Sequence, residues 1–134
     1  ATAPATATPQ PNKAPVAPVV APSNRRVTLS MPSGGAMLSG TVTFAWSADF
    51  ALHAEEGFEA VVWRLGDDPN RNAYGLEAAQ NVLSITVPLE KYSSNNPGRL
   101  VNGQTYQWGV RIYNKRTNRA ELVSEARTFT YTGN

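Results

Sequence analysis

The sequence predicts an all-β protein built as an antiparallel two-sheet sandwich of about seven strands. Three observations predict this fold class. Several short runs alternate apolar and polar residues, which is the pattern of strands with one buried face. Turn-forming Gly, Pro and Asn residues separate these runs. No stretch of useful length shows the apolar spacing of an amphipathic helix.

Composition limits the classes of function that are open to this chain. With 134 residues and a hydrophobic fraction of 41%, it can hold one ordinary domain. Its 12 basic and 10 acidic side chains are mixed along the sequence, which argues against nucleic acid as a partner, because such proteins cluster their cations. The absence of Cys excludes disulfides and thiolate metal sites. No apolar run approaches the roughly 20 residues of a membrane span, so we expect no membrane insertion by this chain.

Residues 1–25 differ from the rest because Ala, Pro, Thr and Val dominate them. Their recurrent prolines remove backbone donors and fix φ, so we predict a disordered, extended linker rather than a helix or a sheet. The alternatives are a dispensable tail or a Pro-rich peptide ligand. We expect the β-sandwich domain to span residues 26–134. The chain does not begin with Met, so we expect it to be part of a longer protein.

Two strands are predicted in the first part of the domain. Residues 27–31 alternate and are followed by a Pro-Ser-Gly-Gly breaker at 32–35, which predicts a short edge strand ended by a turn. Residues 41–47 alternate more regularly, with three apolar side chains on one face. These three are Val42, Phe44 and Trp46.

The next strand, predicted at residues 58–65 after an irregular segment, is apolar on both faces. Its facing therefore stays open, since either of two sets of side chains can point into the core. A strand of this kind is covered on both sides or exposes an apolar patch. The two sets are Phe58, Ala60 and Val62, and Val61, Trp63 and Leu65.

Strand patterns recur in the second half of the domain. Residues 82–89 alternate, and Pro88 near their end favours an edge strand. The clearest alternation follows at residues 100–113, and a last strand is expected at 124–131. Residues 76–80 would form at most one helical turn. The apolar face of the clearest strand consists of Tyr106, Trp108, Val110 and Ile112, and loops are expected at 66–72, 91–99 and 114–120.

Short motifs in three of these strands resemble fibronectin type III domains. Phe58-x-Ala60-x-Val62 is similar to the third strand of that family, and Trp46 to a tryptophan in its second strand. Leu100-x-x-Gly103-x-x-Tyr106-x-Trp108-x-Val110 resembles the stretch that carries the family's tyrosine corner. Asn102 stands where the family usually has Pro, and the loop at 91–99 is longer than is typical.

This resemblance covers roughly residues 26–131 and implies a class of function. Modules that look similar lie behind Ala/Pro/Thr linkers in bacterial surface and sensor proteins. The resemblance implies a non-catalytic binding or spacer module of a larger bacterial protein, outside the cytoplasm at the cell surface or secreted. Its partner would be another protein or the neighbouring domains. The alternative is a carbohydrate-binding accessory module of a secreted enzyme, with a glycan as partner.

Two tryptophans are candidates for the centre of the core. Immunoglobulin-type sandwiches often join their sheets by a disulfide two residues after the corner tyrosine. Trp108 occupies that position here, and the facing strand offers Trp46. Because the chain has no Cys, we expect the two indoles to fill the centre by packing.

The polar residues suggest no enzyme, no cofactor and no metal site. His53 is the single histidine, so neither a metal triad nor a Cys–His pair can be assembled around it. The acidic and amide side chains at 67–72 offer oxygen atoms that calcium would accept, but the same segment is a good turn without it. Glu55 and Glu56 are adjacent, whereas a glycosidase needs two carboxylates across a cleft.

Aromatic, apolar and Arg side chains suggest one binding surface. If Val61 and Trp63 face outward, they lie beside Arg111 and Tyr113 of the neighbouring strand, a mixture favoured at protein interfaces. Trp63 and Tyr74 would alternatively form a flat platform for a sugar. In a third outcome, the loop through Tyr74 covers Trp63 as part of the fold. The candidate binding residues are Val61, Trp63, Tyr74, Arg111 and Tyr113.

Overall fold

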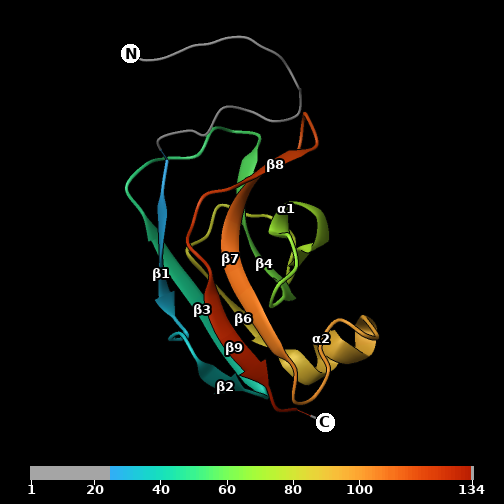
Figure 1. Ribbon diagram of the computed structural model, residues 1–134. Coiled ribbons are helices and arrows are strands. Elements are labelled where there is room, and N and C mark those ends of the chain that lie inside the picture. Colours follow the sequence, from blue (N-terminus) through green and yellow to red (C-terminus); the bar gives the residue numbers. More distant parts are fainter. Residues whose placement is uncertain (1–24, 134) are drawn as a thin grey trace.

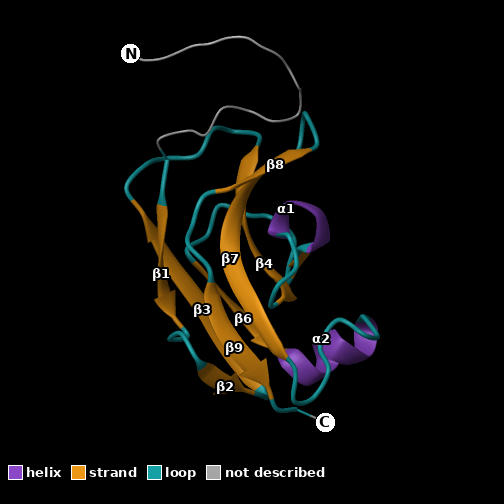
Figure 2. Cartoon of the chain, viewed as in Figure 1, coloured by secondary structure: helices purple, strands orange, loops and turns teal. Residues whose placement is uncertain are grey.

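The structure, a computed structural model, describes residues 25–133, which form a two-layer β-sandwich with two short helices (Figures 1 and 2). The predicted fold class is therefore confirmed. The linker predicted at residues 1–25 lies outside the described residues, apart from Arg25. Neither described helix has the length and apolar character needed to cross a membrane.

The first sheet has three antiparallel strands in the order β1-β3-β6. They are β1 (Val27–Met31), β3 (Thr41–Ala48) and β6 (Ser84–Pro88). The alternation predicted from the sequence sets their facing, because Phe44 and Trp46 of β3 are buried between the sheets while Thr43 points outward and bonds Thr86 across the strand pair. Pro88 ends the edge strand β6, as expected.

The second sheet has the order β2-β9-β7-β4-β5, with β8 also paired to β7. The longest strand, β7, lies at its centre and pairs with β4, β8 and β9. The pairing between β2 and β9 is parallel, a local departure from the predicted antiparallel pattern. The strands are β2 (Ala36–Leu38), β4 (Glu56–Arg64), β5 (Tyr74–Gly75), β7 (Thr105–Asn114), β8 (Arg119–Leu122) and β9 (Arg127–Tyr131).

Several elements differ from the sequence prediction. The strands β2, β5 and β8 were not predicted, because each is too short to show a period of alternation. Helix α1 (Pro69–Asn72) lies within the predicted loop at 66–72, where the Asp68 carboxylate caps it by accepting from the Asn70 backbone N–H at 2.9 Å. No helical turn forms at 76–80, since Gln80 pairs with Phe58 instead.

Helix α2 (Leu89–Asn95) replaces the end of one predicted strand and the start of a predicted loop. Pro88 stops the sheet, because it has no N–H to donate. Leu89 and Tyr92, three residues apart, then lie on one helix face and are buried. A single buried pair is too weak a sequence signal to distinguish a short helix from an irregular loop.

Aromatic side chains fill the centre of the sandwich. Trp46 and Trp108 are both buried in the core, as expected. The ring that packs edge-on against Trp108 is, however, Phe44, at 5.0 Å between centroids, whereas Trp46 packs against Phe58 at 6.3 Å. Neither indole N–H has a hydrogen-bond acceptor among the described residues. The two tryptophans therefore contribute through packing rather than hydrogen bonding.

The tyrosine corner implied by the resemblance is present. Tyr106, at the start of β7, is buried, and its hydroxyl accepts the backbone N–H of Val101 at 2.7 Å. Its ring stacks on Phe129 of the neighbouring strand β9 at 5.7 Å. Together these contacts fix the direction in which the chain enters the central strand of the second sheet.

We expect Trp108→Ala to lower the free energy of unfolding by about 3–5 kcal/mol, because it removes the largest fully buried side chain and leaves a cavity beside Phe44. Trp108→Phe should cost less, since it keeps an edge-on aromatic ring. Urea unfolding followed by circular dichroism measures both variants. Equal losses for Ala and Phe would contradict a packing role for this ring.

Candidate functional site

Strand β4 presents its two apolar sets of side chains to different environments. Phe58, Ala60 and Val62 belong to the core between the sheets. In the register with β7, Trp63 lies opposite Gln107 and Val61 opposite Gly109, so these side chains project from the outer face of the second sheet. The facing left open by the sequence is thereby decided, with Trp63 outward.

Outward facing does not make Trp63 accessible. Trp63 is 3% exposed and Val61 0%, so the expectation that they form an exposed patch is wrong. The indole lies across β7: its Nε1–H donates to Gln107 Oε1 at 3.0 Å, and its far ring edge lies over Gly109. A Cβ at Gly109 would sit 3.4 Å from the Trp63 ring and 3.0 Å from Ser124 Oγ. The glycine thus provides the space that buries the indole.

Tyr74 does not form a sugar platform with Trp63. Its ring is 44% exposed, but the Arg99 guanidinium lies over it at 4.0 Å from the centroid. Tyr74 and Trp63 line a common small hollow, in which Trp63 contributes little accessible surface. The flat pair of exposed rings on which the carbohydrate alternative depended is therefore not formed.

Arg111 and Tyr113 lie at a hollow of about 520 Å³ on the outer face of β4 and β7, which we call the outer hollow. Sequence reasoning identified these two residues but missed the others that line it. Strand pairing could have found one of them, because Glu59 stands directly opposite Arg111. The six lining residues are Glu59, Ala78, Ala79, Arg111, Tyr113 and Lys115.

An ion pair organises the floor of the outer hollow. Arg111 Nε donates to Glu59 Oε1 at 2.6 Å, and both side chains are partly shielded from solvent. The Glu59 carboxylate lies over Gly75, where any side chain would collide with it. The short strand β5 therefore provides room for the acid that holds Arg111 in place.

The hairpin that joins β7 to β8 forms the rim of the outer hollow. Its turn is ordered by Asn114, whose Oδ1 accepts the backbone N–H groups of Arg116 and Thr117 at 2.9 and 3.0 Å. Asn118 adopts a φ of 57°, and the Tyr113 hydroxyl donates to its Oδ1. The Tyr113 ring is therefore held in one orientation at the edge of the hollow.

The remaining sequence candidates have local structural roles. His53 is largely exposed, and its backbone N–H donates to Glu56 Oε1 at 2.9 Å. The Asp68 carboxylate caps helix α1. Among residues 25–133, no group of three or more His, Cys, Asp or Glu side chains could hold a metal ion.

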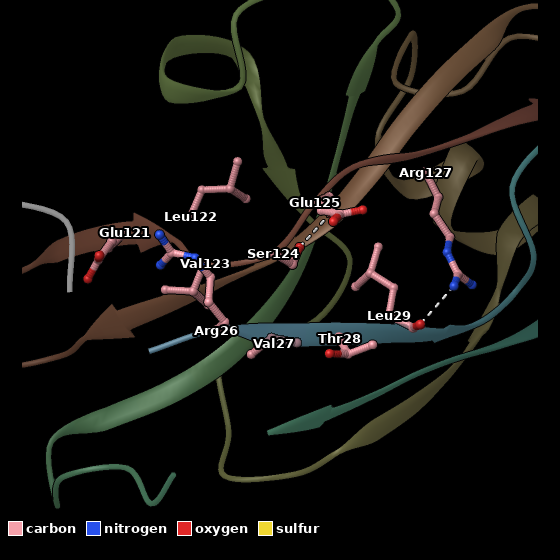
Figure 3. Close-up of a pocket in the computed structure, with 10 residues that line it drawn as sticks. All are labelled: Arg26, Val27, Thr28, Leu29, Glu121, Leu122, Val123, Ser124, Glu125 and Arg127. Carbon is pink, nitrogen blue, oxygen red and sulfur yellow. Dashed lines mark hydrogen bonds between the residues drawn. The ribbon is translucent and has the colours of Figure 1, made fainter. Parts of the chain in front are cut away.

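A groove of about 590 Å³ follows the seam between β1 and the segment that leads from β8 into β9 (Figure 3). Its floor consists of side chains of the core, including Val27, Leu29 and Val123. The Arg127 guanidinium at one end donates to the carbonyl oxygens of Leu29, Ser30 and Pro32 at 2.8 to 3.0 Å. The seam therefore links the two sheets, and the terminal nitrogens of Arg127 already donate to backbone carbonyl groups.

No protein-family model and no curated protein matches the chain. A solved structure, the solution structure of the fibronectin type-III domain of human fibronectin type III domain containing protein 3, is similar with a TM-score of 0.45 and 16% sequence identity. The similarity covers 87% of this chain and 91% of that one. The two sheets and the tyrosine corner described above make this a fibronectin type III-like sandwich.

The burial of all three tryptophans gives a direct test of this surface. Because Trp46, Trp63 and Trp108 are each at most 3% exposed, acrylamide should quench the fluorescence of the folded protein weakly and that of the urea-unfolded protein strongly. Trp63→Phe should leave the weak quenching unchanged. A readily quenched component that disappears in Trp63→Phe would show that the indole is exposed. It would then support the exposed binding surface predicted from the sequence.

Proposed function

We propose that this chain is a non-catalytic module of a larger protein that holds its flanking segments apart and offers a surface to a protein partner. The observation that carries the spacer part is that the chain enters and leaves the sandwich at opposite ends (Figure 1). We further propose that it works outside the cytoplasm, at the cell surface or secreted, with residues 1–25 as its linker and 26–134 as its domain. The recurrent Pro residues of that linker support the spacer role, because Pro-rich segments are extended and semi-rigid.

At the entry end, Arg25 joins the linker to the sandwich. Its guanidinium donates to both carboxylate oxygens of Glu56 at 2.8 and 3.2 Å and lies over the Phe50 ring at 5.6 Å. Glu56 is opposite Asn114, the last residue of β7. Arg25, the last residue of the proposed linker, therefore contacts the sandwich directly.

At the exit end, the chain leaves beside the first residues of β7. The Tyr131 carbonyl accepts the backbone N–H of Gly103 at 2.8 Å. Gly133 passes so close to Glu90 and the Tyr131 ring that no side chain would fit there. Burial, followed by the nearby Glu90 carboxylate, raises the pKa of Tyr131 above its ordinary value.

The two ends are therefore separated by nearly the full length of β7. A strand of 10 residues extends about 33 Å at roughly 3.3 Å per residue. A module that is anchored at both ends in this way sets a distance and a direction between whatever precedes and follows it. That property supports the spacer role without requiring any ligand.

The binding part of the proposal is supported by the outer hollow. It contains a tyrosine and an arginine, two residue types that are enriched where proteins bind proteins. The carbohydrate-binding alternative is less well supported, because Trp63 is buried and the Tyr74 ring is covered by Arg99. A protein partner is thus the stronger proposal.

The spacer role predicts a long and narrow distance between the two ends. The chain has no native Cys, so Thr28→Cys with Thr132→Cys allows two spin labels to be placed at exposed sites near the entry and the exit. Pulsed electron paramagnetic resonance should give a single narrow distribution on the order of 30 Å. A broad distribution, or one centred below about 15 Å, would exclude a rigid spacer.

The Arg25 anchor predicts a pH dependence of stability. The hydrogen bond from Arg25 lowers the pKa of Glu56 below its ordinary value of 4.5. This contribution to stability is therefore present above about pH 4.5 and is lost as the pH falls through the lower, folded-state pKa. Between roughly pH 6 and pH 3, the range in which carboxyl groups titrate, the free energy of unfolding of Glu56→Gln should fall less than that of the wild type. Urea titrations at several pH values measure both. Parallel losses in the two proteins would show that Arg25 and Glu56 do not interact in solution.

A further inference from the structure

We propose that the outer hollow binds an acidic peptide segment of another protein, with one carboxylate held between Arg111 and Lys115. The apolar part of the segment would lie against Tyr113 and the two alanines. This inference rests on the binding part of the proposed function and names the chemistry of its partner. It is independent of the spacer role.

Unused hydrogen-bond donors on Arg111 provide the first argument. A guanidinium carries five N–H donors in a planar fork. Glu59 accepts the one on Nε, and no described residue accepts from the two terminal nitrogens. Those two nitrogens carry four donors in the geometry that matches a carboxylate. Arg111 is 25% exposed in its side chain, so the donors are reachable but not fully hydrated.

Glu59 holds the fork before any ligand arrives. Its carboxylate fixes the Nε side of Arg111 at 2.6 Å, in a space that exists because Gly75 has no side chain. An arginine that is already oriented loses less conformational freedom on binding than a mobile surface arginine does. This is the difference between the outer hollow and an ordinary exposed cation.

The charges that line the outer hollow favour an anion. Glu59 balances one of the two cations that line it, which leaves one positive charge in excess. The Lys115 ammonium forms no ion pair with a described residue, so it is available to a ligand. One incoming carboxylate would restore neutrality, whereas a neutral sugar would leave Lys115 uncompensated.

The apolar walls argue for a peptide rather than a small free anion. Ala78 and Ala79 line one part of the hollow, and the Tyr113 ring, fixed through Asn118, lines another. The volume of about 520 Å³ exceeds what a carboxylate group fills and accommodates the aliphatic atoms of neighbouring residues. Burying the aliphatic part of a side chain against these walls is favourable, and a small ion such as acetate offers little apolar surface to bury.

The test is an NMR titration of the isotopically labelled full chain with the capped peptide Ac-Ala-Glu-Ala-Glu-Ala-NH2. The Arg111 Nε–H resonance and the amide resonances of Tyr113 and Lys115 should shift and saturate. The same peptide with Gln in place of Glu, and sodium acetate at equal concentration, should produce no saturating shift. Equal effects of the Gln peptide or of acetate, shifts confined to the tip of the hairpin, or no shift at all would each overturn the proposal.

Three variants locate the interaction. Lys115→Gln and Arg111→Gln should each weaken binding of the Glu peptide, by roughly tenfold for Arg111, whose fork makes the bidentate contact. Arg116→Gln is the matched control, because it removes the same charge from the adjacent, 72% exposed side chain outside the hollow. Equal weakening by Arg116→Gln would mean that only overall charge matters and would contradict a defined site.

Two readouts separate the possible failures. Melting curves establish that each variant is folded, and Lys115→Gln, at an exposed position, keeps the test decisive if Arg111→Gln is destabilised. Failure of the peptide to bind would overturn the acidic-segment inference while leaving the spin-label distance, and hence the spacer role, unaffected. A short or broad spin-label distance would do the reverse.

Discussion

The edge-on contact between Phe44 and Trp108 is the interaction on which the sandwich depends. Each ring comes from the middle strand of its sheet, Phe44 from β3 and Trp108 from β7. Both rings are 0% exposed. Trp108 stands two residues after the corner tyrosine, where immunoglobulin-type sandwiches often have a disulfide-bonded cysteine. A disulfide forms only in an oxidising environment, whereas the packing of two aromatic rings depends on how closely they fit. The neighbouring strands of each sheet pair with these two middle strands.

Strand alternation predicted those parts of the fold that have one buried face. It located β1, β3 and β7 and their inward residues, because water on one side and the core on the other impose a period of two. It failed for the two-residue and three-residue strands β5 and β2, which are defined by the strands they pair with and not by their own sequence. Local pattern carries no information about such tertiary pairing.

The candidate site shows the same division between local and distant information. The sequence could place Trp63, Arg111 and Tyr113 on one outer face, but it could not show that Trp63 is buried. That outcome depends on Gly109, 46 positions later, being opposite Val61 in a register that only the folded sheet defines. The Glu59–Arg111 pair could have been predicted from the sequence. Once one pair of opposite residues on two adjacent strands is known, the other pairs follow from the register.

The hydrogen bonds of Arg127 have a mechanical consequence. This residue opens β9 and grips three carbonyl groups at the end of β1, so it links the first and the last strand directly. A pull applied between entry and exit would act along the lengths of these two strands in opposite directions. A strand that is pulled along its length is loaded in shear, so its hydrogen bonds share the force. A strand that is pulled away sideways loses its hydrogen bonds one after another. Under the proposed spacer role, tension along the line that joins the two ends would therefore load β1 and β9 in shear.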